Sequence, residues 1–219
     1  MQDALPRLYY FPGNANLAPH IVLEEIGVPY ALELVDRKND AHKSAAYLAL
    51  NPNGAIPALV DGDLVLYESA AICLYLADKH PEASLVPALR TPERAHCYKW
   101  LMWCTNTMQA TLMHYFYPER MVDSGDAASA KQVSRTAETR VGGMLDQLDA
   151  QLASHGGDWM LRSGYSVVDP FAFMLCRWTR GFQRPGRSLP HLGPYLQRML
   201  ARPAVQRMFA AEKLSPPFV

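Results

Sequence analysis

The feature that most constrains the fold of this chain is a change of pattern along its 219 residues. Residues 7–79 alternate between short apolar runs of strand type and segments of helical periodicity, which is typical of α/β domains. From residue 92 onward the strand-type runs stop, and apolar residues recur at spacings of three and four. The pattern predicts an α/β domain at residues 1–80 and an all-α helical domain at 92–219, joined by a linker at 81–91.

The first domain is expected to run strand, helix, strand, short helix, strand, strand, helix. The predicted ranges are 7–11, 17–26, 30–35, 43–50, 58–60, 64–66 and 69–79. An Asp61-Gly62 pair between the last two strands suits a tight hairpin turn.

The second domain is expected to consist of helices alone. Thr91 followed by Pro92 favours a helix start, and the apolar stripe that follows continues to about Tyr117. A second stripe at 133–152, closed by Gly156, predicts an antiparallel partner helix.

The remaining helices are marked by a capping pattern and by proline. Ser166 and Asp169 have the spacing of a capping-box variant just before an apolar run at 171–178, which predicts a buried helix. Two shorter helices are expected at 190–201 and 203–211.

Charge and cysteine usage exclude several classes of function. Lys plus Arg and Asp plus Glu both total 21, so bulk charge favours neither nucleic acid nor an anionic membrane as a partner. The start, MQDALPRLYYFPG, lacks the pattern of a secretion signal, and no segment approaches the roughly 20 apolar residues of a membrane span. The four cysteines have no metal-ligand spacing. We therefore expect a cytoplasmic protein with no metal, no nucleic acid and no membrane among its ligands.

The loop after the first strand is the first candidate site. Pro12-Gly13 leads into Asn14 and Asn16 just before a helix, whose N-terminus favours a bound anion such as a thiolate. The Asn amides, or the hydroxyl of Tyr10, have N–H or O–H groups to donate to that sulfur. The alternative is that Asn16 only caps the helix and Asn14 only turns the chain.

Two further segments carry recognition chemistry. Pro57 begins a strand, and a cis bond there would expose the backbone N–H and C=O of Ile56 to a ligand's peptide group; the alternative is an ordinary trans proline. Glu68 and Ser69 begin a helix and suit the ammonium and carboxylate of an α-amino acid; the alternative is a plain helix cap with a solvated Glu.

In this order and spacing, the motifs PGNAN, NPNGAIPALVDGD and LYESAAI resemble those of the cytosolic glutathione transferases, with most likeness to bacterial beta-class and theta-like members. The resemblance implies a thioredoxin-like N-terminal domain, glutathione as co-substrate, and a cytoplasmic, detoxifying homodimer. It also implies roles for the glutathione-binding candidates, of which Lys38 and Asn53 are the weaker matches. These residues are Lys38, His42, Asn53, Ile56, cis Pro57, Glu68 and Ser69.

The chain departs from the beta-class pattern at the activating position, where Ala15 replaces the cysteine and Asn16 the next serine. A mixed disulfide with the protein is therefore not expected, and Asn14, Asn16 and Tyr10 remain open as the thiolate donor. A second departure falls at Gln109-Ala110, where beta-class members have a His-Lys pair.

The expected reaction is attack of the glutathione thiolate on a small hydrophobic electrophile. The expected pocket wall for that electrophile comprises Gln109, Met113, Tyr117 and Trp178, unless these side chains only pack the helical core. Two alternatives are a glutathione-dependent ether-cleaving lyase or disulfide or peroxide reductase, and a non-catalytic binding or regulatory protein with this fold.

Overall fold

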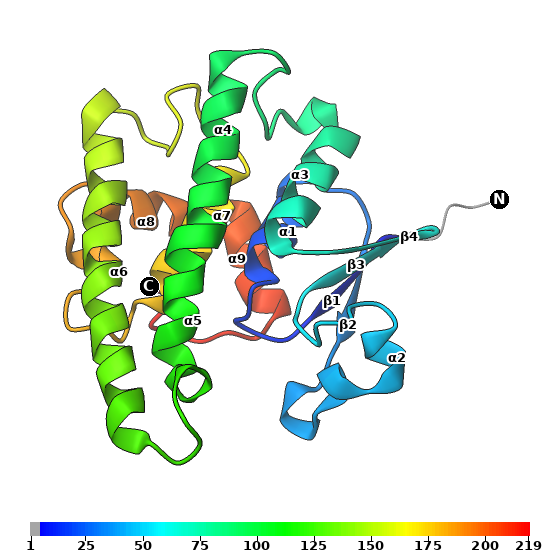
Figure 1. Ribbon diagram of the computed structural model, residues 1–219. Coiled ribbons are helices and arrows are strands. Elements are labelled where there is room, and N and C mark those ends of the chain that lie inside the picture. The colour runs from blue at the N-terminus through cyan, green and yellow to red at the C-terminus, as the bar shows by residue number, and fades with distance from the viewer. Residues whose placement is uncertain (1–4) are drawn as a thin grey trace.

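The computed structural model describes residues 5–219, so the first four residues of the predicted N-terminal domain lie outside the described residues. A small sheet with its helices stands beside a larger group of long helices (Figure 1). Along residues 5–219, no helix has both the length and the hydropathy to cross a membrane.

The sheet contains β1 (Arg7–Tyr10), β2 (Ala31–Leu34), β3 (Ala58–Asp61) and β4 (Leu64–Tyr67) in the order β2-β1-β3-β4. Strands β1 and β2 are parallel, whereas β3 is antiparallel to both β1 and β4. This is the expected thioredoxin-like arrangement. The hairpin between β3 and β4 turns at Gly62, whose φ of 60° suits glycine.

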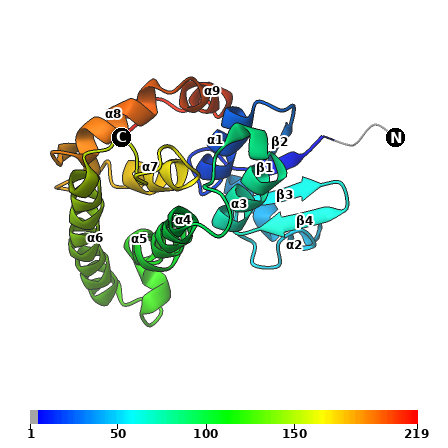
Figure 2. The ribbon, with the colours of Figure 1, turned by 90° about the horizontal axis from the view of Figure 1, so that it is seen from above.

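Alternation along the strands assigns each face of the sheet to different helices. Leu8 pairs with Leu59 across β1 and β3, and both are buried in the core that includes α1 (Leu17–Ile26) and α3 (Ser69–Lys79). The next pair, Tyr9 and Ala58, packs in a second cluster with Tyr47 of α2 on the opposite face (Figure 2).

The segment between β2 and β3 is less helical than predicted. Instead of one helix at 43–50 it forms two 3₁₀ turns (Arg37–Asn39 and Ala41–Lys43) and a short α2 (Ala45–Leu48). The segment is divided because two side chains cap separate turns. Asp36 caps the first 3₁₀ turn by accepting from the Lys38 N–H, and Ser44 caps α2 by accepting from the Tyr47 N–H.

The first long helix begins as predicted and stays helical to Phe116, but its middle is of π type. Thr91 caps α4 (Pro92–Trp103) by accepting from the Arg94 N–H at 3.2 Å. A π-helical segment (Cys104–Gln109) then separates α4 from α5 (Ala110–Phe116). Within this stretch the Thr111 hydroxyl donates to the Thr107 carbonyl, and such bonds compete with the helical ladder.

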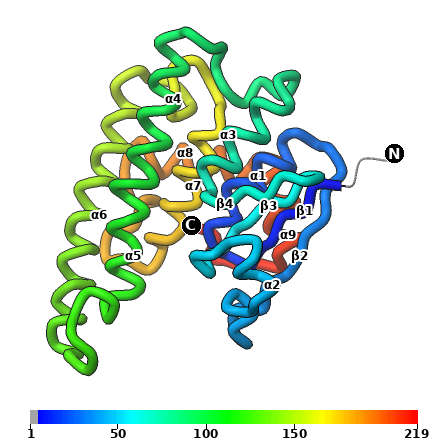
Figure 3. The backbone as a smooth tube through the Cα atoms, turned by 45° about the vertical axis from the view of Figure 1, so that its right-hand side comes forward, coloured from blue at the N-terminus to red at the C-terminus, as the bar shows by residue number. Residues whose placement is uncertain are grey.

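The partner helix, α6 (Ala127–His155), runs alongside α4 and α5 (Figure 3). It begins before the predicted stripe because Asp126 caps it by accepting from the Ser129 N–H. It ends where predicted, at Gly156, which has a φ of 61°.

Helix α7 (Val168–Trp178) occupies the interior between α4 and α8 (Figure 2). The Asp169 carboxylate accepts from the Ser166 N–H at 2.8 Å, which is the acidic half of a capping box, and it also accepts from the Met160 N–H at 2.9 Å. Burial raises the pKa of Asp169 to about 7, although these two N–H groups oppose the shift.

Two helices close the chain, α8 (Leu192–Ala201) and α9 (Pro203–Ala211), and α9 lies against α1. The remaining 3₁₀ turns are Pro81–Ala83, Pro118–Met121 and Gly186–Ser188. Buried residues of the sheet, of α1 and of α4 to α9 form one hydrophobic cluster. The two predicted parts of the chain therefore share a core, and this shared core fixes the position of the cleft between them.

Candidate functional site

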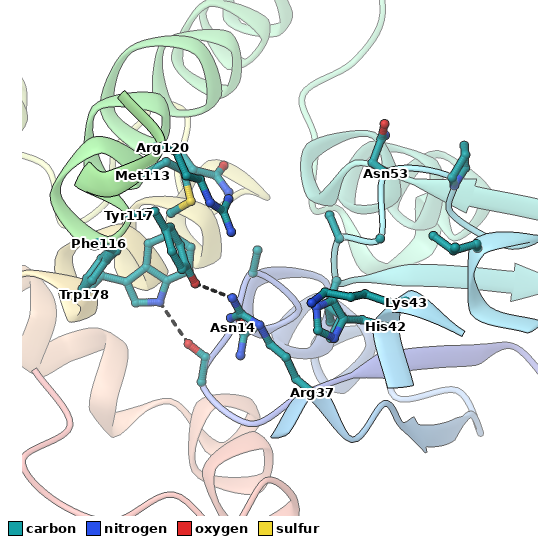
Figure 4. A pocket seen from close by; sticks show the side chains of 18 of the residues that line it. Asn14, Arg37, His42, Lys43, Asn53, Met113, Phe116, Tyr117, Arg120 and Trp178 are labelled. Carbon is teal, nitrogen blue, oxygen red and sulfur yellow. Dashed lines mark hydrogen bonds between the residues drawn. The ribbon is translucent and has the colours of Figure 1, made fainter. Parts of the chain in front are cut away.

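A cleft of about 690 Å³ lies between the loops at the edge of the sheet and the helices α5 and α7 (Figure 4). On the sheet side it is lined by Gly13–Ala15, by residues around α2 and by the segment 52–56. On the helical side it is lined by residues 109–120, at intervals, and by Trp178 and Arg180.

Asn14 lines the cleft, and its amide is oriented by Arg37. The guanidinium donates to Oδ1 of Asn14 at 3.0 Å. Because a guanidinium only donates, the amide oxygen must face Arg37 and the NH₂ group must face away from it. No acceptor for that NH₂ is recorded within residues 5–219, so its N–H groups remain available to an anion in the cleft.

Arg37 also joins the two walls of the cleft. Its second terminal nitrogen donates to the hydroxyl of Tyr117 at 2.6 Å (Figure 4). The Tyr117 ring in turn packs against the guanidinium of Arg120, whose central carbon lies 4.1 Å from the ring centroid. Asn14 is therefore held by an arginine that is itself held by the helical wall.

Asn16 and Tyr10 lie outside the cleft lining. Asn16 is 0% exposed; its Oδ1 accepts from the Phe11 N–H, and its Nδ2 donates to Glu212 at 2.7 Å. Its side chain makes no capping bond either, so it holds the loop in place rather than capping α1. Burial and, secondly, the charge of Glu212 raise the pKa of the Tyr10 hydroxyl.

Glu212, at the end of α9, anchors the loop that carries Asn14. Its carboxylate is 2% exposed and accepts from the Gly13 N–H at 2.9 Å, from Asn16, and from Nδ1 of His20 at 2.7 Å. On the other side of the loop, the indole N–H of Trp178 donates to the Gly13 carbonyl at 3.1 Å (Figure 4). The loop conformation therefore depends on two helices of the second half of the chain.

The buried imidazole of His20 is held at both nitrogens. Its Nε2 lies 2.9 Å from the Tyr30 hydroxyl, which donates its only proton to Glu24. The Tyr30 oxygen is then left to accept from Nε2, while Nδ1 lies 2.7 Å from a carboxylate oxygen of Glu212, so the orientation of the ring is fixed on both sides. Burial and Glu24 raise the pKa of Tyr30, which keeps its hydroxyl protonated.

The segment before β3 presents free backbone groups to the cleft. The Ile56–Pro57 bond is cis, as the resemblance implies. Tyr47 and Asn51 both donate to the Ala55 carbonyl at 2.7 Å, which fixes the segment. Ile56 lines the cleft, whereas Pro57 is buried behind it. The Ile56 N–H and C=O make no recorded bond within the described chain, so both are free for a ligand.

The start of α3 is not a plain serine cap. Glu68 occupies the cap position without a side-chain capping bond, and Ser69 is the first helical residue. Glu68 has a φ of 73°, which is strained for a residue with a side chain and is common at binding sites. Ser69 is 7% exposed, and no partner for its hydroxyl is recorded among residues 5–219. Both lie outside the lining of the cleft.

The predicted contacts to the glycyl end divide into those inside and outside the cleft. His42 and Asn53 line it, while Lys38 is exposed and does not. Nδ1 of His42 is buried and unpartnered within the described residues, although its side chain as a whole is 15% exposed. Lys43, which sequence reasoning missed, lines the cleft beside it.

All four residues predicted for the electrophile wall line the cleft, namely Gln109, Met113, Tyr117 and Trp178. The sequence analysis missed Phe116, Arg120 and Arg180 on the same wall, and Arg37 and Glu212 behind the loop. Phe116 continues the aromatic run that ends at Tyr117, so spacing alone could have found it. Arg37 and Glu212 carry no local signal, because the residues that they bond lie at least 23 positions away in the sequence.

Cysteine and metal chemistry find no support among the described residues. All four cysteines are buried and free, and burial raises the pKa of Cys97 to about 11 and of Cys176 to about 12. Ala15, at the position where the sequence resemblance implies a cysteine in beta-class members, lines the cleft. Within residues 5–219, no group of three or more His, Cys, Asp or Glu side chains could hold a metal ion.

Comparison with known proteins gives consistent matches over the whole length. A family model described as the glutathione S-transferase N-terminal domain matches residues 17–79. A glutathione S-transferase of Xanthomonas campestris is 31% identical over 95% of this chain and 100% of its own.

Solved structures agree. A glutathione transferase homologue from Sulfitobacter with bound glutathione has a TM-score of 0.86 at 26% identity, covering 96% of this chain and 99% of its own. A beta-class glutathione S-transferase of Sphingomonas chungbukensis has a TM-score of 0.82 at 31% identity, covering 95% and 100%.

Proposed function

This chain belongs to the glutathione S-transferase family and is a glutathione transferase with glutathione as its co-substrate. We propose that it binds the tripeptide along the sheet side of the cleft and activates the thiol with the side-chain amide of Asn14. The observation that carries the proposal is the Arg37 bond to Oδ1, which leaves the Asn14 NH₂ free to donate.

The γ-glutamyl end of glutathione is assigned to the start of α3. The Ser69 hydroxyl and the first amides of the helix suit its carboxylate, and Glu68 suits its ammonium group. The strained φ of Glu68 and the unpartnered hydroxyl of Ser69 support this assignment.

The rest of the tripeptide is assigned to the loops around α2. The free N–H and C=O of Ile56 would pair with the cysteinyl unit, with Pro57 holding that backbone in place. His42 and Asn53 would approach the glycyl carboxylate, because both line the cleft. We replace Lys38 in this role with Lys43, since Lys38 does not reach the cleft.

The chemistry follows from stabilising the sulfur as an anion. A free thiol has a pKa of about 8.5, so an N–H donor and the nearby N-terminus of α1 increase the thiolate fraction at neutral pH. The thiol proton passes to solvent, and the thiolate attacks an electrophilic carbon on the helical side of the cleft. A carbon–sulfur bond forms as the leaving group departs with its bonding electrons.

The test compares Asn14→Ala with Asn106→Ala, an exposed asparagine of the π-helical segment outside the cleft lining. With 1-chloro-2,4-dinitrobenzene we expect Asn14→Ala to lower kcat/KM about 10- to 100-fold, as for one bond to a charged group. The ultraviolet absorbance of enzyme-bound thiolate should titrate at higher pH in this variant. Unchanged kcat/KM and an unchanged titration would assign activation to another group.

We further propose that the enzyme is a cytoplasmic homodimer. Exposed apolar side chains lie on the edge strand β4, at Leu64 and Val65, and on α4, at Tyr98 and Met102. An interface between copies would cover them. Four free buried cysteines suit a reducing compartment. Sedimentation of the protein and of Val65→Glu tests the dimer, because the charge should release monomers.

A further inference from the structure

The charged side chains that line the cleft are basic. Arg37, Lys43, Arg120 and Arg180 line it, and no Asp or Glu of residues 5–219 stands among the lining residues. Charges of one sign that line a cleft add to the electrostatic potential inside it, so this cleft favours an anion.

These basic side chains differ in whether they already form hydrogen bonds or ion pairs with other side chains of the protein. Arg37 is committed to Asn14 and Tyr117, and Lys43 lies 3.0 Å from a carboxylate oxygen of Asp40. Arg120 and Arg180 have no recorded carboxylate partner among residues 5–219.

The surroundings of these two arginines leave their charge unneutralised. Arg120 packs on the ring of Tyr117, and Arg180 donates to the carbonyl of Arg177 at 3.1 Å. Arg177 is itself a buried cation: burial and, secondly, the charge of Arg180 lower its pKa to about 10.

The position of Arg120 separates it from the groups assigned to glutathione. In Figure 4 it lies with Met113, Phe116 and Trp178 on the helical wall, whereas His42 and Asn53 lie across the cleft. Asn14, the proposed partner of the sulfur, stands between the two sides. An anion at Arg120 would therefore belong to the second substrate and not to glutathione.

We propose that the acceptor substrate is an apolar, aromatic electrophile that carries an anionic group, a carboxylate or a similar oxyanion. Its ring lies on Met113, Phe116 and Trp178, and its anion is bound by Arg120 and Arg180, whose planar forks match a carboxylate. This proposal rests on the proposed function of the site. For an aryl halide, the glutathione sulfur forms a bond to the ring carbon that carries the halogen. The carbon–halogen bond then breaks, and the halide leaves with the electron pair.

The experiment uses two probes that differ in charge: 4-chloro-3,5-dinitrobenzoate and its neutral carboxamide. Each kcat/KM is divided by the uncatalysed rate constant with glutathione, so that intrinsic reactivity cancels. The variants are Arg120→Gln, Arg180→Gln and their double, with Arg140→Gln on the exposed face of α6 as the matched control.

We expect Arg120→Gln to lower the ratio of benzoate to carboxamide kcat/KM about tenfold and the double variant to lower it further, because each removes a charged hydrogen-bond donor. The KM for glutathione should stay unchanged, and Arg140→Gln should resemble the wild type. Added salt should reduce only the benzoate rate.

Two outcomes would overturn the inference. Either both probes lose activity equally in Arg120→Gln and Arg180→Gln, or the KM for glutathione rises while the probe ratio holds. Both leave the proposed function intact, since the carboxamide would still be conjugated by the wild type. If the wild type conjugated neither probe nor 1-chloro-2,4-dinitrobenzene, the proposed function would fall first.

Discussion

The two walls of the cleft differ in what they present to a ligand: mainly backbone groups on the sheet side and side chains on the helical side. The sheet side offers the backbone N–H and C=O of Ile56 on a segment fixed by two bonds to the Ala55 carbonyl, and the first amides of α3 add backbone groups outside the cleft lining. The helical side offers side chains, among them Met113, Tyr117 and Trp178. A backbone wall changes little when side chains change, whereas a side-chain wall changes with every substitution. The first suits a constant co-substrate, and the second suits a variable one.

Glu212 connects the two walls, because it lies at the end of α9 and its carboxylate binds the Gly13–Asn16 loop of the sheet wall. We expect Glu212→Ala to lower the free energy of unfolding by about 3 to 5 kcal/mol, since it leaves the His20 imidazole, the Asn16 amide and the Gly13 N–H without their common partner. Urea unfolding measures the loss. Glu93→Ala, an exposed carboxylate on α4, should change stability by less than about 0.5 kcal/mol.

Glutathione affinity gives a second readout of Glu212. In Glu212→Ala measured below its melting temperature, glutathione should bind more weakly while the conservative Glu212→Gln retains part of the affinity. Full affinity in the alanine variant would mean that the loop keeps its shape unaided, and the two walls would then be independent.

Ser69→Ala tests the backbone wall at its one assigned side-chain hydroxyl. We expect KM for glutathione to rise about 10-fold, as for one hydrogen bond to a carboxylate. Stability without ligand should hold within about 0.5 kcal/mol, because the hydroxyl has no recorded partner in the described chain. Steady-state kinetics measure the KM, and melting curves with and without glutathione measure the stability and the effect of the ligand. Ser154→Ala on α6 is the control. An equal effect in both serine variants would remove Ser69 from the site.

The smallest effect is expected at Arg37, where the two walls meet. Arg37→Met should lower kcat/KM for a neutral electrophile about 5-fold by freeing the Asn14 amide to rotate. In a double-mutant cycle with Asn14→Ala, the two losses should overlap by about 1 kcal/mol, because both act on one bond to sulfur. Strictly additive losses would show that Arg37 acts without Asn14.

The sequence could predict features that depend on local signals, but not those that depend on contacts between distant residues. Helices α1 and α3 have the predicted bounds, because Gly27, Ser69 and the apolar spacing are local signals. The backbone motifs around Ile56 and Ser69 were equally visible. The placement of Asn14 in the cleft and of Asn16 behind it was not, since it depends on Arg37 and Glu212, which lie 23 and 196 residues from their respective asparagines.

The π-helical segment shows a different limit. Apolar spacing continues through Cys104–Gln109, so the stripe from Thr91 to Tyr117 predicted one long helix and gave no sign of a change in helix type. Hydroxyl-to-carbonyl bonds such as that of Thr111 compete with the helical ladder in this region, and periodicity does not reveal them.

The anchor of the Asn14 loop also bears on the order of folding. Gly13 and Glu212 are 199 residues apart, so their bond is non-local and depends on the contacts that bring the two ends of the chain together. Contacts of this kind form late, after local helices and hairpins. We therefore expect the loop that carries Asn14 to be anchored after local helices have formed, and recovery of glutathione binding to lag behind recovery of helical structure during refolding.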